Sequence, residues 1–222
     1  MLTAVERASE LRPGLWRWDA FHPAYEQDVT SVLVEADDDV VLVDPLAPRN
    51  GEGAPFWRAL DAAAEAGKRL TVVVSVPDHA RSMPAIAARY PGATVHAALP
   101  ARQRSLAGVP VELLADGATL PAGVVACATG RADERAIWIA PHRTLVVGDV
   151  MIGTDEGGLA ICPGDWLPAG VTRATVAAAF APLLELELHH VVPAHGDAPD
   201  DPQAAFAAAV AEAGAPTAPD AS

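Results

Sequence analysis

The stretch that decides the fold is Val72–Ser82, with the sequence VVVSVPDHARS. Its first half is a run of β-branched residues typical of a buried strand, and Pro77 ends that run. The pair Asp78-His79 follows where the predicted strand stops. Because a rigid sheet can aim polar groups at strand ends into one crevice, the pair is a candidate for a binding site.

The segments around this stretch predict an α/β chain. Strand patterns come first, over 14–20, 29–36 and 40–45. Two helices, over 54–67 and 80–90, then alternate with strands over 69–76 and 93–99. This order predicts antiparallel strands at the start and parallel pairing with helical crossovers in the middle.

The second half again places strands before helices. Its strand patterns cover 109–115, 122–129, 135–140 and 143–153. A helix over 171–186, a short strand over 189–194 and a last helix near 202–213 follow. Two sheets packed face to face with helices outside satisfy this order. We expect a single domain over residues 1–213 and a disordered tail over 214–222.

Composition narrows the classes of partner. The chain has 222 residues, of which 51% are hydrophobic, and this is enough to bury a sizeable core. Its formal net charge of -14 argues against nucleic acids and anionic membranes and favours a cation or a small-molecule substrate. No apolar run reaches membrane-spanning length and the N-terminus lacks a signal-peptide pattern, so we expect a cytoplasmic protein.

Four residues that follow predicted strands are candidate metal ligands: Asp78, His79, Asp149 and His195. Two carboxylates and two imidazoles make a mixed shell suited to Zn, Fe or Mn. Each residue also has a simpler interpretation. Asp78 suits the N-cap of the helix that follows, His79 suits a helix start exposed to water, Asp149 suits a turn, and His195 suits a solvated turn.

Four motifs, in this order, resemble the landmarks of the metallo-β-lactamase superfamily. They are VLVDP (41–45), SVPDHARS (75–82), RTLVVGDVMIG (143–153) and VVPAHGDAP (191–199). The resemblance covers roughly residues 13–200. It implies an αββα sandwich, an α/β (α+β) fold of two mixed β-sheets with helices on the outer faces.

The superfamily's signature H-x-H-x-D-H is incomplete in this chain. Val74 and Val76 stand at its first two histidines, and Arg131 stands most simply at the later histidine. Valine has no lone pair and arginine stays protonated, so the first metal of the superfamily would lack its protein ligands here. A small shift of register would instead place there Thr129, Asp133 or Glu134. An inward carboxylate among these would rebuild a weak first site.

The remaining positions match the other half of the superfamily's centre. The resemblance implies Asp78, His79 and His195 as ligands of the second metal, with Asp78 therefore catalytic, and Asp149 as the bridging carboxylate. We expect one divalent metal, zinc first, with iron or manganese as alternatives. Such an ion lowers the pKa of a bound water and produces hydroxide for attack on a small ester, thioester, lactone or phosphoester.

Three residues are candidate substrate contacts. Arg131, if it points inward, can act catalytically by steadying an oxyanion or a substrate carboxylate, and it is equally suited to an ion pair with Asp149 or Asp78. His22 lies in a loop that can face the cleft or the solvent. Trp166 lies in the Gly/Pro-rich connection ICPGDWLP.

Two functions from different classes therefore remain open. The first is a metal-dependent hydrolase that uses a single metal and an activated water. The second is a catalytically silent protein of the same fold that binds a metabolite or a partner protein. The retained ligand-type residues favour the first, and the missing first-metal ligands favour the second.

Overall fold

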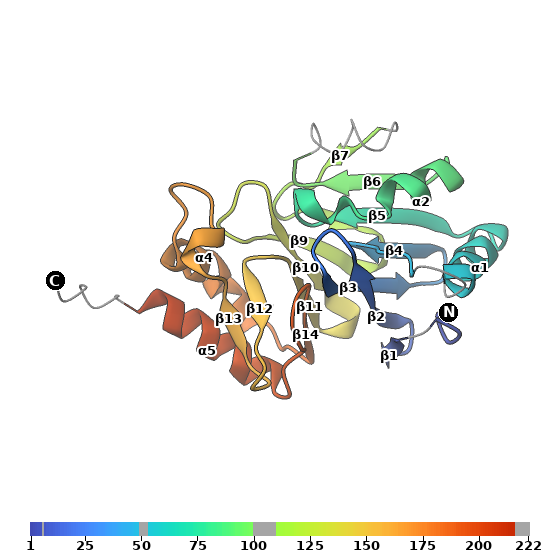
Figure 1. The fold of residues 1–222 in the computed structure, drawn as a ribbon. Coiled ribbons are helices and arrows are strands. Elements are labelled where there is room, and N and C mark those ends of the chain that lie inside the picture. The colour runs from blue at the N-terminus through green and yellow to red at the C-terminus, as the bar shows by residue number, and fades with distance from the viewer. Residues whose placement is uncertain (6, 49–52, 100–109, 216–222) are drawn as a thin grey trace.

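The computed structural model describes residues 1–5, 7–48, 53–99 and 110–215 (Figure 1). Within these ranges the strands form two large sheets and one two-stranded hairpin. The elements that position the candidate site lie where both large sheets end.

The first sheet takes seven strands from the described residues, in the order β1 to β7. They are β1 (Ala8–Arg12), β2 (Leu15–His22), β3 (Gln27–Glu35), β4 (Asp39–Val43), β5 (Arg69–Val74), β6 (Thr94–Ala97) and β7 (Glu112–Leu113). Strands β1 to β4 pair antiparallel, and β4 to β7 pair parallel. The predicted change of pairing is confirmed, and helices α1 (Gly53–Glu65) and α2 (Met83–Arg89) connect β4 to β5 and β5 to β6.

The second sheet takes five strands from the described residues, in the order β14-β11-β10-β9-β8. They are β8 (Thr119–Leu120), β9 (Val124–Ala128), β10 (Arg135–Ile139), β11 (Thr144–Val147) and β14 (His190–Pro193). The segment predicted as one strand over 143–153 is two strands, because the chain leaves the sheet at Gly148. It resumes as β12 (Met151–Gly153), which pairs with β13 (Leu159–Ile161).

Two helices cover the second sheet, α4 (Arg173–Phe180) and α5 (Pro202–Gly214). The helix predicted over 171–186 changes to a 3-10 helix at Ala181–Glu185, where Pro182 cannot donate the backbone hydrogen bond of an α-helix. Gly214, the first residue of the predicted tail, still belongs to α5. Residues 216–222 of that tail lie outside the described ranges.

Successive side chains along each sheet point alternately toward the other sheet and toward the helices that cover the outer face. Val41, Val43 and Val73 pack against the second sheet, in the same cluster as Val146 and Val192. Their neighbours on the opposite faces pack under helices in two further clusters, one with Leu42, Val72, Phe56 and Leu60 and one with Leu145, Val147, Phe180 and Phe206. The αββα sandwich is therefore confirmed, and each fully buried side chain of this kind contributes about 1.5–3 kcal/mol.

No helix within the described ranges combines the length and the apolar character needed to cross a lipid bilayer.

Candidate metal centre

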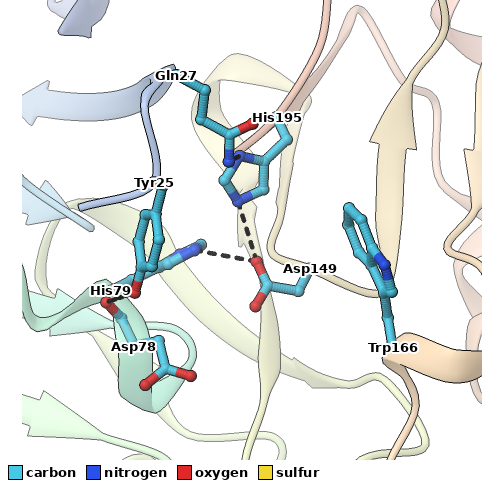
Figure 2. Close-up of a pocket in the computed structure, with 7 residues that line it drawn as sticks. All are labelled: Tyr25, Gln27, Asp78, His79, Asp149, Trp166 and His195. Carbon is cyan, nitrogen blue, oxygen red and sulfur yellow. Dashed lines mark hydrogen bonds and ion pairs between the residues drawn. The ribbon is translucent and has the colours of Figure 1, made fainter. Parts of the chain in front are cut away.

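Three side chains from the ends of different strands meet at one pocket. His79 lies in the 3-10 helix η2 (Pro77–Ala80) after β5, Asp149 follows β11, and His195 follows β14 (Figure 2). The pocket has a cavity volume of about 220 Å³. It is lined by Tyr25, Gln27, Asp78, His79, Asp149, Trp166 and His195.

The three side chains present a compact donor set. Asp149 Oδ1 lies 3.0 Å from His79 Nε2 and 3.3 Å from His195 Nε2. One ligand atom from each residue lies within 4.8 Å of the others. Asp149 Oδ1 is buried, yet neither contact gives it a hydrogen bond of acceptable geometry. Two imidazole nitrogens facing one carboxylate oxygen without a hydrogen bond fit a metal ion with N and O ligands.

The Asp44 carboxylate fixes the orientation of His79. His79 Nδ1 lies 2.9 Å from Asp44 Oδ2, so Nδ1–H donates to the carboxylate and Nε2 keeps its lone pair for the pocket. Asp44 also accepts from the backbone N–H of Ser75 at 2.7 Å and from the Ser75 hydroxyl. A positive φ of 48° at Asp44 turns its carboxylate toward β5, a conformation that Asp tolerates better than most residues. Sequence reasoning gave Asp44 no site role, although Asp44 is the fourth residue of the VLVDP motif.

The electrostatics of this group favour positive charge. Burial alone would raise the pKa of Asp149, but the imidazoles of His195 and His79 hold it well below its usual range. Burial and the Arg81 guanidinium oppose a charged His79. The carboxylates of Asp44 and Asp149 outweigh both and raise the pKa of His79. Protons or a metal ion can supply the positive charge that the carboxylates of Asp44 and Asp149 stabilise.

His195 is held by a tight turn that joins the sheets. Gly153 N donates to His195 O at 2.9 Å, and Thr30 N on β3 donates to Ala194 O at 3.0 Å. Gly196 adopts a φ of 79°, and a Cβ there would lie 2.3 Å from Gly153 O, so only glycine fits. The Gln27 side-chain amide lies 3.2 Å from His195 Nδ1 and leaves Nε2 facing Asp149.

Solved structures of one class resemble this chain over nearly its whole length, although no protein-family model and no curated protein matches it. The metallo-beta-lactamase DIM-1 superposes with a TM-score of 0.66 at 12% identity, over 93% of this chain and 96% of that chain. The mono-zinc form of the metallo-beta-lactamase FIM-1 from Pseudomonas aeruginosa gives 0.62 at 14% identity, over 97% and 100%. A metallo-beta-lactamase family protein from Thermus thermophilus gives 0.63 at 15%, over 91% and 80%.

The chain has the metallo-β-lactamase fold. Identity at this level establishes the fold alone, so the chemistry has to be argued from the residues of this chain. In this metallo-β-lactamase fold the ends of both sheets supply the pocket, which is why residues far apart in the sequence meet there.

Asp78 does not join the metal-type group of this metallo-β-lactamase fold. The group holds His79, Asp149 and His195, whereas Asp78 is exposed and its carboxylate points away from Asp149 (Figure 2). It still lines the pocket. The alternative interpretation of Asp78 as the N-cap of the next helix is wrong, because Asp78 lies inside η2 and Ser82 holds the cap position of α2.

The two positions to which the sequence resemblance assigned first-metal histidines, Val74 and Val76, offer no metal donor. Val74 and Val76 are each 1% exposed and belong to the core. Arg131 pairs through Nε with Asp133 at 3.0 Å and through Nη1 with Glu134 at 3.2 Å. Within the described residues Arg131 therefore forms its ion pairs inside its own loop, and the alternative of an ion pair with Asp149 is wrong. Arg131 is also absent from the described lining of the pocket.

Glu134 is the buried carboxylate among the register alternatives. Its side chain is fully buried, and Oε1 accepts from Val150 N at 3.1 Å, directly after Asp149. A Cβ at Gly148 would lie 2.7 Å from Glu134 Oε1, so glycine makes room for the carboxylate. Burial raises the pKa of Glu134 to about 7, against the opposing effects of the Val150 N–H and Arg131.

Of the two remaining candidate substrate contacts, one lines the pocket and the other packs behind a residue that lines it. Trp166 lines the pocket, and its role as a substrate contact stays a prediction. His22 is absent from the described lining and stacks on Tyr25, with ring centroids 4.3 Å apart. Sequence reasoning missed Tyr25 and Gln27, whose signal was their place in the turn between two predicted antiparallel strands.

Proposed function

We propose that this protein is a metal-dependent hydrolase that uses one divalent metal, held by His79, Asp149 and His195. The observation that carries the proposal is the meeting of their three ligand atoms within 4.8 Å at the pocket. The absence of a hydrogen bond to the buried Asp149 Oδ1 supports it, since a cation would satisfy that atom. Zinc is the first metal to test, because it accepts two imidazoles and a carboxylate and leaves a fourth position open.

A divalent metal bound there would supply Lewis acidity and lower the pKa of a water molecule toward neutrality, for hydrolysis of a small ester, thioester, lactone or phosphoester. The protein's own residues prepare the site. Asp44 holds the proton of His79 on Nδ1, away from the pocket. The Gln27 amide likewise lies at Nδ1 of His195, on the side of the ring away from Asp149. His79 is buried, so few water molecules can compete for its Nε2.

A single metal is consistent with the other half of the centre. Val74 and Val76 offer no donor, and the Arg131 guanidinium is already paired with two carboxylates. Among the similar structures, FIM-1 is described in a mono-zinc form. The ion pair between Arg131 and Glu134 places a fixed positive charge on this side of the fold without a second metal.

Metal analysis by inductively coupled plasma mass spectrometry tests the proposal. We expect about one Zn, Fe or Mn per chain in the parent protein and none in His195→Ala. His189→Ala is the matched control, because His189 is a partly exposed histidine outside the pocket lining, and it should keep the metal. Hydrolysis of aryl esters and lactones should disappear on chelation and return on reloading.

The incomplete first half favours one other function, a catalytically silent protein whose pocket binds a metabolite or a partner. A parent protein that contains no metal and resists reloading would contradict the hydrolase and support this alternative. Asp149 would then be held by its contacts with His79 and His195 alone.

A further inference from the structure

Arg81 is a partly buried cation next to the metal-type group, and the proposed function does not yet use it. It follows His79 by two residues, at the end of η2, and is absent from the described lining of the pocket. Its Nη1 donates to Thr30 O at 2.7 Å and to Asp44 O at 2.9 Å. The guanidinium therefore connects β3 to the end of β4, where the Asp44 carboxylate orients His79.

The backbone of Arg81 indicates that the side chain is what this position requires. Its φ is 40°, in the left-handed region that favours glycine. Glycine would adopt this backbone without strain, whereas a residue with a side chain is strained there. Strain at a residue beside a candidate site points to a role for its side chain, because the strain is otherwise uncompensated.

The charge of Arg81 is not taken up by an ion pair within the described residues. Both hydrogen bonds of Nη1 go to backbone carbonyls, and Nε and Nη2 are buried there without a hydrogen-bond partner. Arg131 differs, because two carboxylates form ion pairs with it. The positive charge of Arg81 is therefore free to act on the neighbouring metal-type group.

This charge reaches the residues of the group. Burial lowers the pKa of Arg81, and the carboxylates of Asp44 and Asp149 act in the opposite direction. After burial, the Arg81 guanidinium is the largest influence against a charged His79. A fixed cation that attracts Asp149 and opposes positive charge on His79 also opposes a divalent ion bound to both.

We propose that Arg81 sets the metal affinity of this centre: its fixed charge stabilises the carboxylates of Asp44 and Asp149 and repels the divalent ion that His79, Asp149 and His195 hold. The inference rests on the proposed function for the identity of the ligands. Arg81 acts through the ligands and lies outside the pocket lining, so it is a positioning residue. The donor set alone would bind the metal more tightly than the parent protein does.

The zinc affinities of two variants test the inference. Arg81→Lys keeps the charge and Arg81→Gln removes it, and both side chains can still donate a hydrogen bond to a backbone carbonyl. Competition with a chelator measures the affinities, and circular dichroism checks that both variants are folded. We expect Arg81→Gln to bind zinc at least about threefold more tightly than Arg81→Lys. A merely structural role predicts no such order. Equal affinities, or tighter binding by Arg81→Lys, would overturn the inference.

Arg135 is the matched control. Its Nη1 also donates to a backbone carbonyl, Glu134 O, at 2.6 Å, and its Nε is also buried without a hydrogen-bond partner within the described residues. Arg135 is not among the main influences on His79 or Asp149. Arg135→Lys and Arg135→Gln should therefore bind zinc with equal affinity.

A second neutral variant covers a failure of Arg81→Gln to fold. Arg81→Gly suits the φ of 40° and also removes the charge. It should likewise bind zinc more tightly than Arg81→Lys, and the opposite order would overturn the inference.

The outcomes separate this inference from the proposed function. If zinc binds in the expected order but the loaded protein hydrolyses no ester, the hydrolase fails and the role of Arg81 holds. If esters are hydrolysed and the two affinities are equal or reversed, the hydrolase holds and the role of Arg81 fails. If only Arg81→Gln binds zinc, the guanidinium prevents metal binding in the parent, which supports the inference and contradicts the hydrolase. Zinc binding by neither protein would overturn both.

Discussion

The two halves of this centre each contain a buried carboxylate, and they differ in the group that supplies positive charge to it. In one half, His79, Asp149 and His195 present donor atoms to a pocket and leave a buried oxygen without a hydrogen bond. In the other half, the Arg131 guanidinium forms an ion pair with the buried Glu134 carboxylate, with Nη1 3.2 Å from Oε2. The first arrangement depends on protons or an added cation for its positive charge, whereas the second contains a permanent cation, Arg131.

The loss of metal-ligand residues from the H-x-H-x-D-H motif has not disrupted the fold around it. Glu134 reaches Val150 N beside Asp149, and Arg135 N donates to Ser75 O at 2.9 Å. Ser75 in turn binds Asp44, which holds His79. The half that lacks metal ligands therefore connects the two loops that carry the retained ligands. We expect substitutions there to reduce stability and substitutions in the retained half to reduce metal binding.

The largest effect on stability is expected from Arg131→Met. It leaves Glu134 buried without its cation, which should lower the free energy of unfolding by about 3 kcal/mol at pH 8. Urea denaturation measures this loss. Arg173→Met removes an exposed pair with Glu212 and should cost less than about 1 kcal/mol. Equal losses in the two variants, or loss of metal from Arg131→Met, would break the comparison.

The pH dependence of Glu134 is the next largest effect. Its pKa is raised from 4.5 to about 7, so the folded state keeps a proton that the unfolded chain loses. The resulting stabilisation is complete below pH 4.5 and is lost as the pH rises through 7, by at most about 3 kcal/mol. In metal-free protein, the stability of the parent relative to Glu134→Gln should therefore fall between pH 5 and pH 8. A difference that stays constant, or that grows with pH, would contradict burial as the dominant influence.

Asp44→Asn tests the half of the centre that contains His79, Asp149 and His195. The amide no longer holds the imidazole of His79 as a carboxylate does, and loss of such support weakens metal binding by about ten- to a hundredfold. Competition with a chelator measures the affinity. Asp39→Asn, at the other end of β4, is the control and should leave the affinity unchanged. Equal affinity in both variants would show that Asp44 serves only the fold.

The smallest effect is expected from Gln27→Ala. This exposed amide makes one hydrogen bond to His195, so its loss should weaken metal binding by about two- to tenfold and leave unfolding unchanged. The same chelator competition applies, with Gln203→Ala as the control. Gln203 accepts from Leu188 N, away from the pocket, so an equal change there would contradict a specific role for Gln27.

The order of the elements, and the strand ends at which the candidate ligands lie, could be predicted from local sequence patterns. Alternation at Val41, Leu42 and Val43 predicts a strand buried on both faces, and the structure divides these side chains between two clusters. The motif order predicted the αββα fold, and the strand ends located His79, Asp149 and His195. Local patterns suffice here because side-chain periodicity depends only on the backbone of the element itself.

The contacts between side chains at the candidate site could be read only from the tertiary structure. Asp78 and His79 are adjacent in the sequence, but η2 turns one toward solvent and the other into the group with Asp149. The partners of Arg131 depended on how the loop before β10 folds back onto itself. Tyr25 in the β2–β3 turn and Gln27 at the start of β3 reach the pocket because the start of β3 lies beside the segment that follows β14. Side-chain direction beyond a strand end depends on turn geometry and on contacts between segments far apart in the chain, which no local pattern encodes.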